Sequence, residues 1–217
     1  MNSTHNKLSG IRSNYAKGEL DEIIVSTNPF DQFRKWFDEV LEAKITEPNA
    51  MTLSTCTPDL AVSARMVLLK GFDRRGFIFY TNYESKKAQS IFTNPNASLT
   101  FFWKEQERQV RIEGKVEKVS NRESAKYFAS RPRLSQLGAI ISKQSSKLAS
   151  KKELLHIFTK LEDEYHDKPI PMPDNWGGMM LIPKYFEFWQ GRPSRLHDRI
   201  VYELTEKKTW DIYRLYP

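Results

Sequence analysis

Apolar residues first recur at helical spacing after a polar stretch that covers residues 1–27. Asn28 is a typical N-cap, and Pro29 suits the first helical position, so the two predict where a helix begins. The helix should end before Glu47-Pro48, because a residue that precedes proline disfavours the α conformation. Its apolar face is predicted to comprise Phe30, Phe33, Trp36, Phe37, Val40 and Leu41.

From Met51 the pattern changes to short runs rich in β-branched and aromatic residues, which predict strands. Turn-forming residues separate several of these runs, and the first three follow one another closely enough to predict an antiparallel meander. A short helix over Ser85–Phe92 is expected to interrupt the series. The predicted strands are 51–57, 62–69, 77–81, 98–103 and 109–119.

The second half of the chain opens with helices and closes with strands. Ser120 with Glu123, and Ser150 with Glu153, each form a capping box, and a further short helix is expected from Arg133. Strands are predicted at 179–182, 185–190, 199–204 and 210–215. The order of helix, strands, helices and strands predicts an α+β, mostly β fold around an antiparallel sheet or barrel. We expect a mobile segment over residues 1–27 and a single domain over 28–217.

The composition adds a preference for anions. The 217 residues carry a formal net charge of +7, which attracts nucleic acid, acidic membranes or phosphorylated small molecules. The only cysteine is Cys56, so no intramolecular disulfide can form and a reducing compartment is favoured. The sequence shows no secretory signal and no apolar run long enough to span a bilayer, so a cytoplasmic location is expected.

Several common ligand motifs are absent from the sequence. It contains neither the glycine-rich dinucleotide fingerprint nor a P-loop, and none of its four histidines lies at metal-binding spacing from another histidine or a cysteine. We therefore predict no metal site. A bound phosphate would have to be held by the side chains of Arg, Lys, Ser and Tyr.

Two clusters of such side chains fall on predicted strands. Arg65 and Lys70 should lie on opposite faces of one strand, because side chains alternate, and could serve two anions. Considered alone, they are better explained as exposed cations on an ordinary strand. Tyr80 and Thr81, followed by Lys86-Lys87, lie where a strand meets the start of a helix, a favourable place for phosphate. A solvated lysine pair explains this second cluster more simply.

Two further clusters are more specific. Tyr127, Arg131 and Ser135 recur every four residues, so successive helical turns could direct a phenol, a guanidinium and a hydroxyl to one point despite Pro132. Here a structural and a functional reading are about equally supported. The segment WQGRPSRLHDR, residues 189–199, combines Trp, three Arg, a His and an Asp in eleven residues. This density favours a ligand site.

With these clusters in view, the sequence resembles the pyridoxamine 5′-phosphate oxidase family. The matching segments are RMVLLK, FYTNYESKKA, ERQVRIEG, YFASRPRLSQLGA, SKQSS, NWGG, EFWQGRPSRLHDR and WDIYRLYP, in the family's order and over about residues 11–217. Two departures stand out. Lys86 replaces a frequent arginine, which keeps the charge and loses the planar fork, and Glu47 stands where some relatives have aspartate.

The resemblance implies an FMN-binding split β-barrel with surrounding helices, assembled as a homodimer. The cofactor-binding residues implied are Arg65, Met66, Val67, Leu68, Leu69, Lys70, Tyr80, Thr81, Lys86, Lys87, Gln109, Gln144, Ser145, Trp189 and Arg199. The substrate-binding residues implied are Lys70, Tyr127, Arg131, Ser135, Arg195 and His197, with Arg12 and Tyr15 on a lid. Arg195 and His197 would be the catalytic pair that faces the substrate ring.

The activity implied is oxidation of pyridoxamine or pyridoxine 5′-phosphate to pyridoxal 5′-phosphate in vitamin B6 metabolism. Molecular oxygen would be the acceptor, giving hydrogen peroxide, and the amine substrate would also give ammonia. Neither nucleic acid nor membrane is an expected partner. Two alternatives stay open: another split-barrel flavin reductase, and a non-catalytic basic module that binds nucleic acid or carries pyridoxal phosphate.

Overall fold

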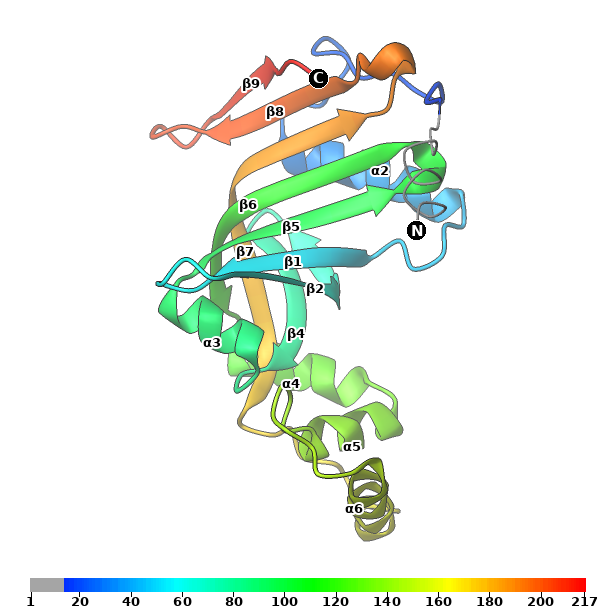
Figure 1. The fold of residues 1–217 in the computed structure, drawn as a ribbon, viewed down its shortest axis with the longest axis vertical. Helices are drawn as coiled ribbons and strands as arrows, with labels where there is room; N and C mark the ends of the chain where they lie inside the picture. Colours follow the sequence, from blue (N-terminus) through cyan, green and yellow to red (C-terminus); the bar gives the residue numbers. More distant parts are fainter. Residues whose placement is uncertain (1–13) are drawn as a thin grey trace, which may run out of the picture. The chain divides into compact units, whose positions relative to one another are not determined.

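The computed structural model describes residues 14–217, which form two compact units that are described separately. Unit 1 comprises residues 14–48, 100–111 and 185–217, and unit 2 comprises residues 49–99 and 112–184. Three strands supply residues to both units, namely β5 (Asn96–Trp103), β6 (Arg108–Lys118) and β7 (Trp176–Gln190) (Figure 1). The predicted α+β class, with mostly β structure, is confirmed.

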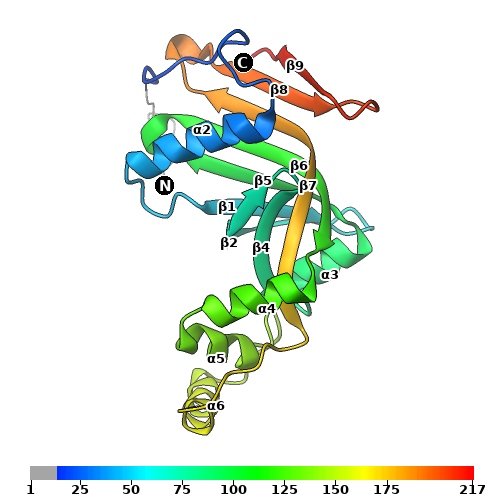
Figure 2. The same ribbon diagram turned by 180° about the vertical axis from the view of Figure 1, so that it is seen from behind.

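Unit 1 contains helix α2 (Pro29–Glu42), whose start was predicted correctly. The side chain of Asn28 accepts the N–H of Phe30 at 3.0 Å, which satisfies one of the donors that a helix start leaves open. The aromatic rings of Phe30 and Trp36 pack edge-on against strand β7. Their ring centroids lie 5.4 Å from that of Phe186 and 5.3 Å from that of Phe188, respectively. Figure 2 shows α2 lying against these strands of unit 1.

One residue of the predicted apolar face is exposed. Leu41 is 50% exposed, whereas Val40 is fully buried. Adjacent residues lie about 100° apart around a helix, so a face centred on Phe33, Trp36 and Val40 turns Leu41 toward solvent. Including Leu41 in the buried face was therefore wrong.

The remaining strands of unit 1 are β8 (Asp198–Leu204) and β9 (Trp210–Arg214). Both pairings are antiparallel: β8 pairs with the second half of β7, and β9 pairs with β8. Two short 3₁₀ helices, η1 (Lys104–Gln106) and η2 (Pro193–Arg195), make the turns after β5 and β7. The separate strands predicted at 179–182 and 185–190 are parts of the single strand β7.

Unit 2 contains β1 (Ala50–Cys56), β2 (Val62–Leu68), β3 (Gly71–Asp73) and β4 (Gly76–Asn82). The strand order is β2-β1-β5-β6-β7-β4-β3, so the predicted meander of the first three runs is wrong. β1 and β2 do pair antiparallel, but β4 pairs with β7. All but one residue of β4 are buried, whereas β2 is largely exposed, so β4 takes an interior place and β2 an edge.

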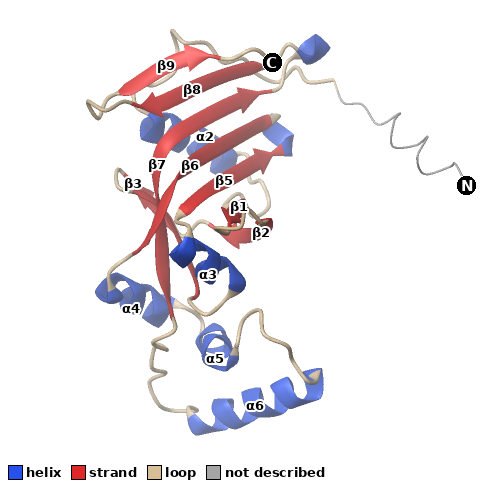
Figure 3. Cartoon of the chain, turned by 60° about the vertical axis from the view of Figure 1, so that its left-hand side comes forward, coloured by secondary structure: helices blue, strands red, loops and turns tan. Residues whose placement is uncertain are grey.

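The helices of unit 2 are α3 (Lys86–Thr93), α4 (Asn121–Ser130), α5 (Arg133–Ile141) and α6 (Lys151–Glu164) (Figure 3). Both predicted capping residues are confirmed, because Ser120 accepts the N–H of Glu123 and Ser150 that of Glu153, each at 3.1 Å. Pro132 ends α4 and precedes α5, and the resulting bend keeps Arg131 between the two helices.

Candidate functional site

A cavity of about 470 Å³ lies within unit 2 and collects half of the predicted site residues. Its lining includes the cations Lys70, Lys87 and Arg131 and no carboxylate. Such an arrangement concentrates positive charge without internal neutralisation, which favours an anionic ligand. The full lining is Met66, Val67, Leu68, Lys70, Tyr80, Thr81, Asn82, Lys87, Tyr127, Arg131, Ser135, Gly138, Ala139, Ser142, Gln144 and Trp176.

Arg131 carries the clearest sign of an unmet ligand. Its NH1 atom is buried and has no hydrogen-bond partner. The guanidinium lies over the Trp176 ring, 4.8 Å from the centroid, and burial lowers the pKa of Arg131. A buried donor without a partner is costly, and a bidentate oxyanion such as phosphate would satisfy it.

Three aromatic rings form one wall of this cavity. Tyr80 stacks on Tyr127 with centroids 3.8 Å apart, and Trp176 stacks on Tyr80 at 5.4 Å. Burial is the main reason that the pKa of Tyr80 rises to about 12. Burial also raises the pKa of Tyr127, so both phenols are protonated at neutral pH and can donate hydrogen bonds to a phosphate oxygen.

A second group of donors gathers around Lys87. The ammonium of Lys87 donates to Oε1 of Gln144 at 2.6 Å and to Oγ1 of Thr81 at 3.2 Å. Burial lowers the pKa of Lys87, and the nearby charge of Arg65 lowers it further. Two cations that repel each other in a partly buried place favour a shared anion.

The predicted strand cluster is only partly brought together. Met66, Val67, Leu68 and Lys70 line the cavity, but the guanidinium of Arg65 binds the carbonyl of Leu53 and the hydroxyl of Thr55. Lys70 lies beyond the end of β2, so the alternation argument that placed Arg65 and Lys70 on opposite faces does not apply to it. Leu69 is buried, 5% exposed.

The start of α3 has a cap that the sequence did not suggest. The N–H of Lys86 donates to the hydroxyl of Ser145 at 3.2 Å, which ties the SKQSS loop to this helix end. Ser145 has a φ of 75°, a left-handed conformation that is uncommon for serine. Lys86 and Ser145 are thus in contact with each other, and neither lines the cavity.

The remaining predicted residues lie in unit 1. Trp189 and His197 pack together with centroids 4.7 Å apart, and Tyr15 meets both rings, at 5.7 Å from Trp189 and 5.9 Å from His197. Gln109 lies on β6. Arg12 falls outside the described residues.

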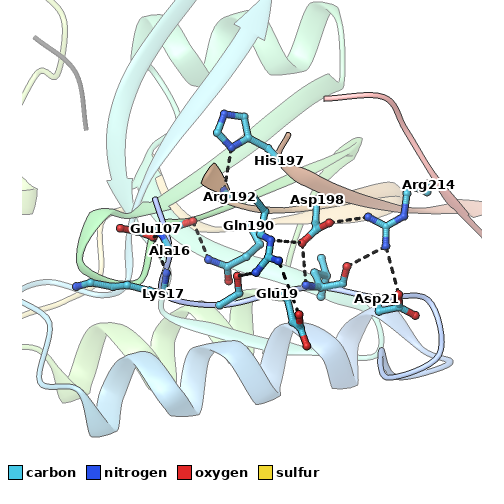
Figure 4. Close-up of polar contacts among 12 residues, drawn as sticks. Ala16, Lys17, Glu19, Asp21, Glu107, Gln190, Arg192, His197, Asp198 and Arg214 are labelled. Atoms are coloured by element: carbon cyan, nitrogen blue, oxygen red, sulfur yellow. Dashed lines mark hydrogen bonds and ion pairs between the residues drawn. The ribbon is translucent and has the colours of Figure 1, made fainter. Parts of the chain in front are cut away.

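The tautomer of His197 follows from its neighbour. The main-chain N–H of Arg192 donates to Nδ1 of His197 at 3.1 Å (Figure 4). Burial and the charge of Arg195 lower the pKa of His197, and Asp198 opposes them. The neutral ring therefore carries its proton on Nε2 and can donate a hydrogen bond to a ligand.

Arg195 and Arg199 have different environments. Arg195 is exposed and has a φ of 62°, and its neighbour Ser194 has a φ of 58°, so two consecutive residues are left-handed. Such strain concentrates at functional sites. Arg199 instead pairs with Glu187, at 2.9 Å from Nε to Oε1 and 3.1 Å from NH2 to Oε2.

Sequence reasoning missed several residues with clear structural roles. Trp176 and Ser142 line the cavity, and Glu107 and Glu187 are buried carboxylates. Trp176 lies in the NWGG segment, whose resemblance to the family could have identified it. Glu107 and Glu187 open the matched segments ERQVRIEG and EFWQGRPSRLHDR, but their residue type does not announce burial, because a carboxylate usually faces solvent.

Over residues 14–217, no helix is long and apolar enough to cross a bilayer. The same residues hold no cluster of three or more side chains suited to a metal ion.

Comparison with known proteins identifies the family. Residues 37–162 match the family described as pyridoxamine 5′-phosphate oxidase, and residues 176–217 match a pyridoxine 5′-phosphate oxidase C-terminal dimerisation region. The chain is 52% identical over 210 residues to pyridoxine/pyridoxamine 5′-phosphate oxidase of Trichormus variabilis, covering 97% of this chain and 98% of that one. It is also 52% identical over 214 residues to the chloroplastic enzyme 1 of Arabidopsis thaliana, covering 97% of this chain and 40% of that one.

Two solved structures agree on the fold. PhzG from Burkholderia lata, in complex with tetrahydrophenazine-1-carboxylic acid, superposes with a TM-score of 0.86 at 27% identity, covering 92% of this chain and 98% of that one. An FMN-binding protein from Nostoc punctiforme related to pyridoxamine 5′-phosphate oxidase gives a TM-score of 0.70 at 16% identity, covering 85% of this chain and 97% of that one. The split β-barrel fold expected from the sequence is confirmed. On the family matches and the relatives together, the chain belongs to the pyridoxamine 5′-phosphate oxidase family.

Proposed function

We propose that this chain is an FMN-dependent oxidase that converts pyridoxamine or pyridoxine 5′-phosphate to pyridoxal 5′-phosphate. The observation that carries the proposal is the cavity of unit 2, with three cations, no carboxylate and a buried guanidinium nitrogen that lacks a partner. The proposal places two anions here, the phosphate of FMN and the phosphate of the substrate. The family relatives support the same reaction.

The donors of unit 2 fit an FMN phosphate. Thr81, Lys87 and Gln144 form one hydrogen-bonded group of a hydroxyl, an ammonium and an amide, and Arg65 adds a second positive charge nearby. These are the residues that would hold FMN, together with the neighbouring main chain of Met66 to Leu68. When bound, FMN supplies the acceptor for a hydride equivalent, with molecular oxygen as the final acceptor and hydrogen peroxide as the product.

The donors around Arg131 fit the substrate phosphate. Tyr127, Arg131 and Ser135 line the same cavity with Lys70. They do not lie on successive turns of one helix, as their spacing suggested, because Pro132 separates α4 from α5. Phosphate binding at a distance from the reacting carbon contributes remote binding energy that positions the ring. In unit 1, His197 would donate from Nε2 to a ring substituent, and Arg195 would stabilise the charge that develops during the transfer.

Three further assignments belong to the proposal. Residues 28–217 act as one FMN-binding domain, with Arg12 and Tyr15 on a preceding lid. The chain functions as a homodimer in the cytoplasm, and its matched C-terminal dimerisation region supports the dimer. Light scattering of the purified protein should give the mass of two chains.

The decisive experiment is a spectrum followed by an assay. The purified protein, or the protein after addition of FMN, should show flavin absorption in the visible range, and pyridoxamine 5′-phosphate should drive oxygen uptake with formation of pyridoxal 5′-phosphate. A colourless protein that does not take up added FMN would contradict the proposal.

A second candidate is an enzyme that acts on a phenazine carboxylate, the class of molecule bound in the PhzG structure. The structural similarity to PhzG favours it, and a phenazine carboxylate would also satisfy a cationic cavity. The higher identity to the pyridoxine/pyridoxamine phosphate oxidases weighs against it. Parallel assays with pyridoxamine 5′-phosphate and with tetrahydrophenazine-1-carboxylic acid separate the two candidates.

A further inference from the structure

A buried carboxylate in unit 1 holds the segment that carries Tyr15. Glu107 is 8% exposed, and its Oε2 atom accepts the main-chain N–H groups of Ala16 at 2.8 Å and of Lys17 at 3.0 Å (Figure 4). Hydrogen bonds to an ionised acceptor are about twice as strong as neutral ones. One oxygen therefore fixes two consecutive peptide groups directly after Tyr15.

Glu107 also holds the end of strand β7. Its carbonyl accepts the N–H of Gly191 at 2.8 Å and an N–H of the Gln190 side chain at 3.2 Å. The residue has a φ of 54° and a ψ of 39°, a left-handed conformation that costs about 1 kcal/mol for a residue with a Cβ. This conformation lets one residue hold residues 16–17 through its side chain and residues 190–191 through its main chain.

The contact between Tyr15 and the end of β7 leaves no room for a side chain at position 191 unless Tyr15 moves. A Cβ on Gly191 would lie 2.7 Å from Cγ of Tyr15, well inside the normal contact distance. Tyr15 in turn meets Trp189 and His197 with its ring, as described above. The position of Tyr15 is thus defined by contacts on both sides.

Other anchors hold the residues that follow. Arg192 donates to the carbonyl of Gly18 at 2.7 Å, and Asp198 accepts the N–H of Leu20 at 3.1 Å. The side chain of Lys17 donates to the carbonyl of Glu105 at 2.8 Å. Among these contacts, only those of Glu107 reach the peptide groups adjacent to Tyr15.

We propose that Glu107 is a positioning residue of the substrate site, which acts by holding Tyr15 against Trp189 and His197. The proposal rests on the proposed function in one respect: His197 is taken to face the substrate. Fixing the Tyr15 ring in advance removes an ordering cost that substrate binding would otherwise bear. Loss of the Glu107 carboxylate should therefore weaken substrate binding without removing any group that touches the substrate.

The first test needs no activity. Amide hydrogen exchange of the FMN-loaded protein should show Ala16 and Lys17 exchanging at least tenfold faster in Glu107→Gln than in the wild type, because the amide keeps the shape and loses the charge. Glu105→Gln is the matched control, since Glu105 is exposed and contacts Lys17 through its main-chain carbonyl. Equal exchange in Glu107→Gln and the wild type would overturn the proposal. If Glu107→Gln does not fold, Glu107→Asp serves for the same measurement.

The second test asks whether Glu107 acts through Tyr15. For pyridoxamine 5′-phosphate, Glu107→Gln and Tyr15→Ala should each raise KM several-fold with a smaller effect on kcat. The double variant should be no worse than Tyr15→Ala alone, because the carboxylate has nothing left to position. Losses that multiply would overturn the proposal. If the wild type shows no oxidase turnover, the proposed function fails, and the exchange experiment still decides the role of Glu107.

Discussion

The buried NH1 nitrogen of Arg131 should contribute to the affinity for a phosphorylated substrate. Its NH1 atom has no partner, so a substrate phosphate would gain a charge-assisted hydrogen bond there. Such bonds contribute about 1.5–3 kcal/mol, so Arg131→Ala should raise KM for pyridoxamine 5′-phosphate roughly 10- to 100-fold. The KM for unphosphorylated pyridoxamine should change little in the same variant. Lys126 is an exposed cation on the preceding helix α4, so Lys126→Ala should leave KM for both substrates unchanged. An unaltered KM in Arg131→Ala would remove Arg131 from the phosphate site.

His197 makes activity depend on pH in a defined direction. Its pKa is lowered by burial and by Arg195, so the neutral ring is retained down to a pH below the usual value of about 6.5. As the pH falls through that lowered pKa, a proton at Nδ1 displaces the N–H of Arg192. Thus kcat/KM should be constant near neutral pH and fall only on the acid side of about pH 6.5. In His197→Asn this dependence should disappear; an unchanged acid decline would assign it to another group.

At the scale of the element, local signals in the sequence were reliable. Asn28, Ser120 and Ser150 each accept the main-chain N–H that their cap position predicts, because capping involves residues only two or three apart. The partner of β4 could not be read this way. Tyr80 of β4 lies opposite Gly178 of β7, nearly a hundred residues further along the chain. The burial of β4, which the structure shows, is what explains its position inside the sheet.

Strand β7 supports a prediction about stability. Glu187 is 3% exposed and pairs with Arg111 at 3.1 Å and with Arg199, and the hydroxyl of Tyr185 donates to it at 3.2 Å. Breaking a buried ion pair costs about 3–5 kcal/mol, and we expect the lower end because both arginines are partly solvated. For a chain of this size, Glu187→Gln should lower Tm by roughly 6–12 °C.

The control for this prediction lies on the neighbouring strand β8. Glu203 also accepts a tyrosine hydroxyl, from Tyr213 at 2.8 Å, but it is exposed. Glu203→Gln should therefore change the free energy of unfolding by no more than about 0.5 kcal/mol. Equal Tm values for the two variants would show that the Glu187 cluster is not a stabilising element.

At the scale of the whole molecule, the sequence supplied the residues of the site but not their grouping. The resemblance named Lys87, Gln144, Tyr127 and Arg131, and the structure places all four around one cavity. The net charge of +7 indicated only that the ligand should carry negative charge. The stronger argument, that this cavity has cations without a carboxylate, needed the fold, because its residues come from strands, helices and loops far apart in sequence.

The cations that line the cavity repel one another, and this repulsion destabilises the folded chain until an anion binds. Binding of FMN should therefore raise the free energy of unfolding. At a free concentration of about 100 times its Kd, a ligand adds about 2.7 kcal/mol, which corresponds to a rise in Tm of roughly 5–10 °C for a chain of this length. Removal of FMN should reverse this rise in Tm.

Lys87→Ala should reduce the rise in Tm that FMN causes, because the variant lacks the ammonium that donates to Gln144 and Thr81. Lys126→Ala should show the same rise as the wild type. Differential scanning fluorimetry over an FMN titration measures both. If Lys87→Ala gains as much from FMN as the wild type, the flavin phosphate lies elsewhere.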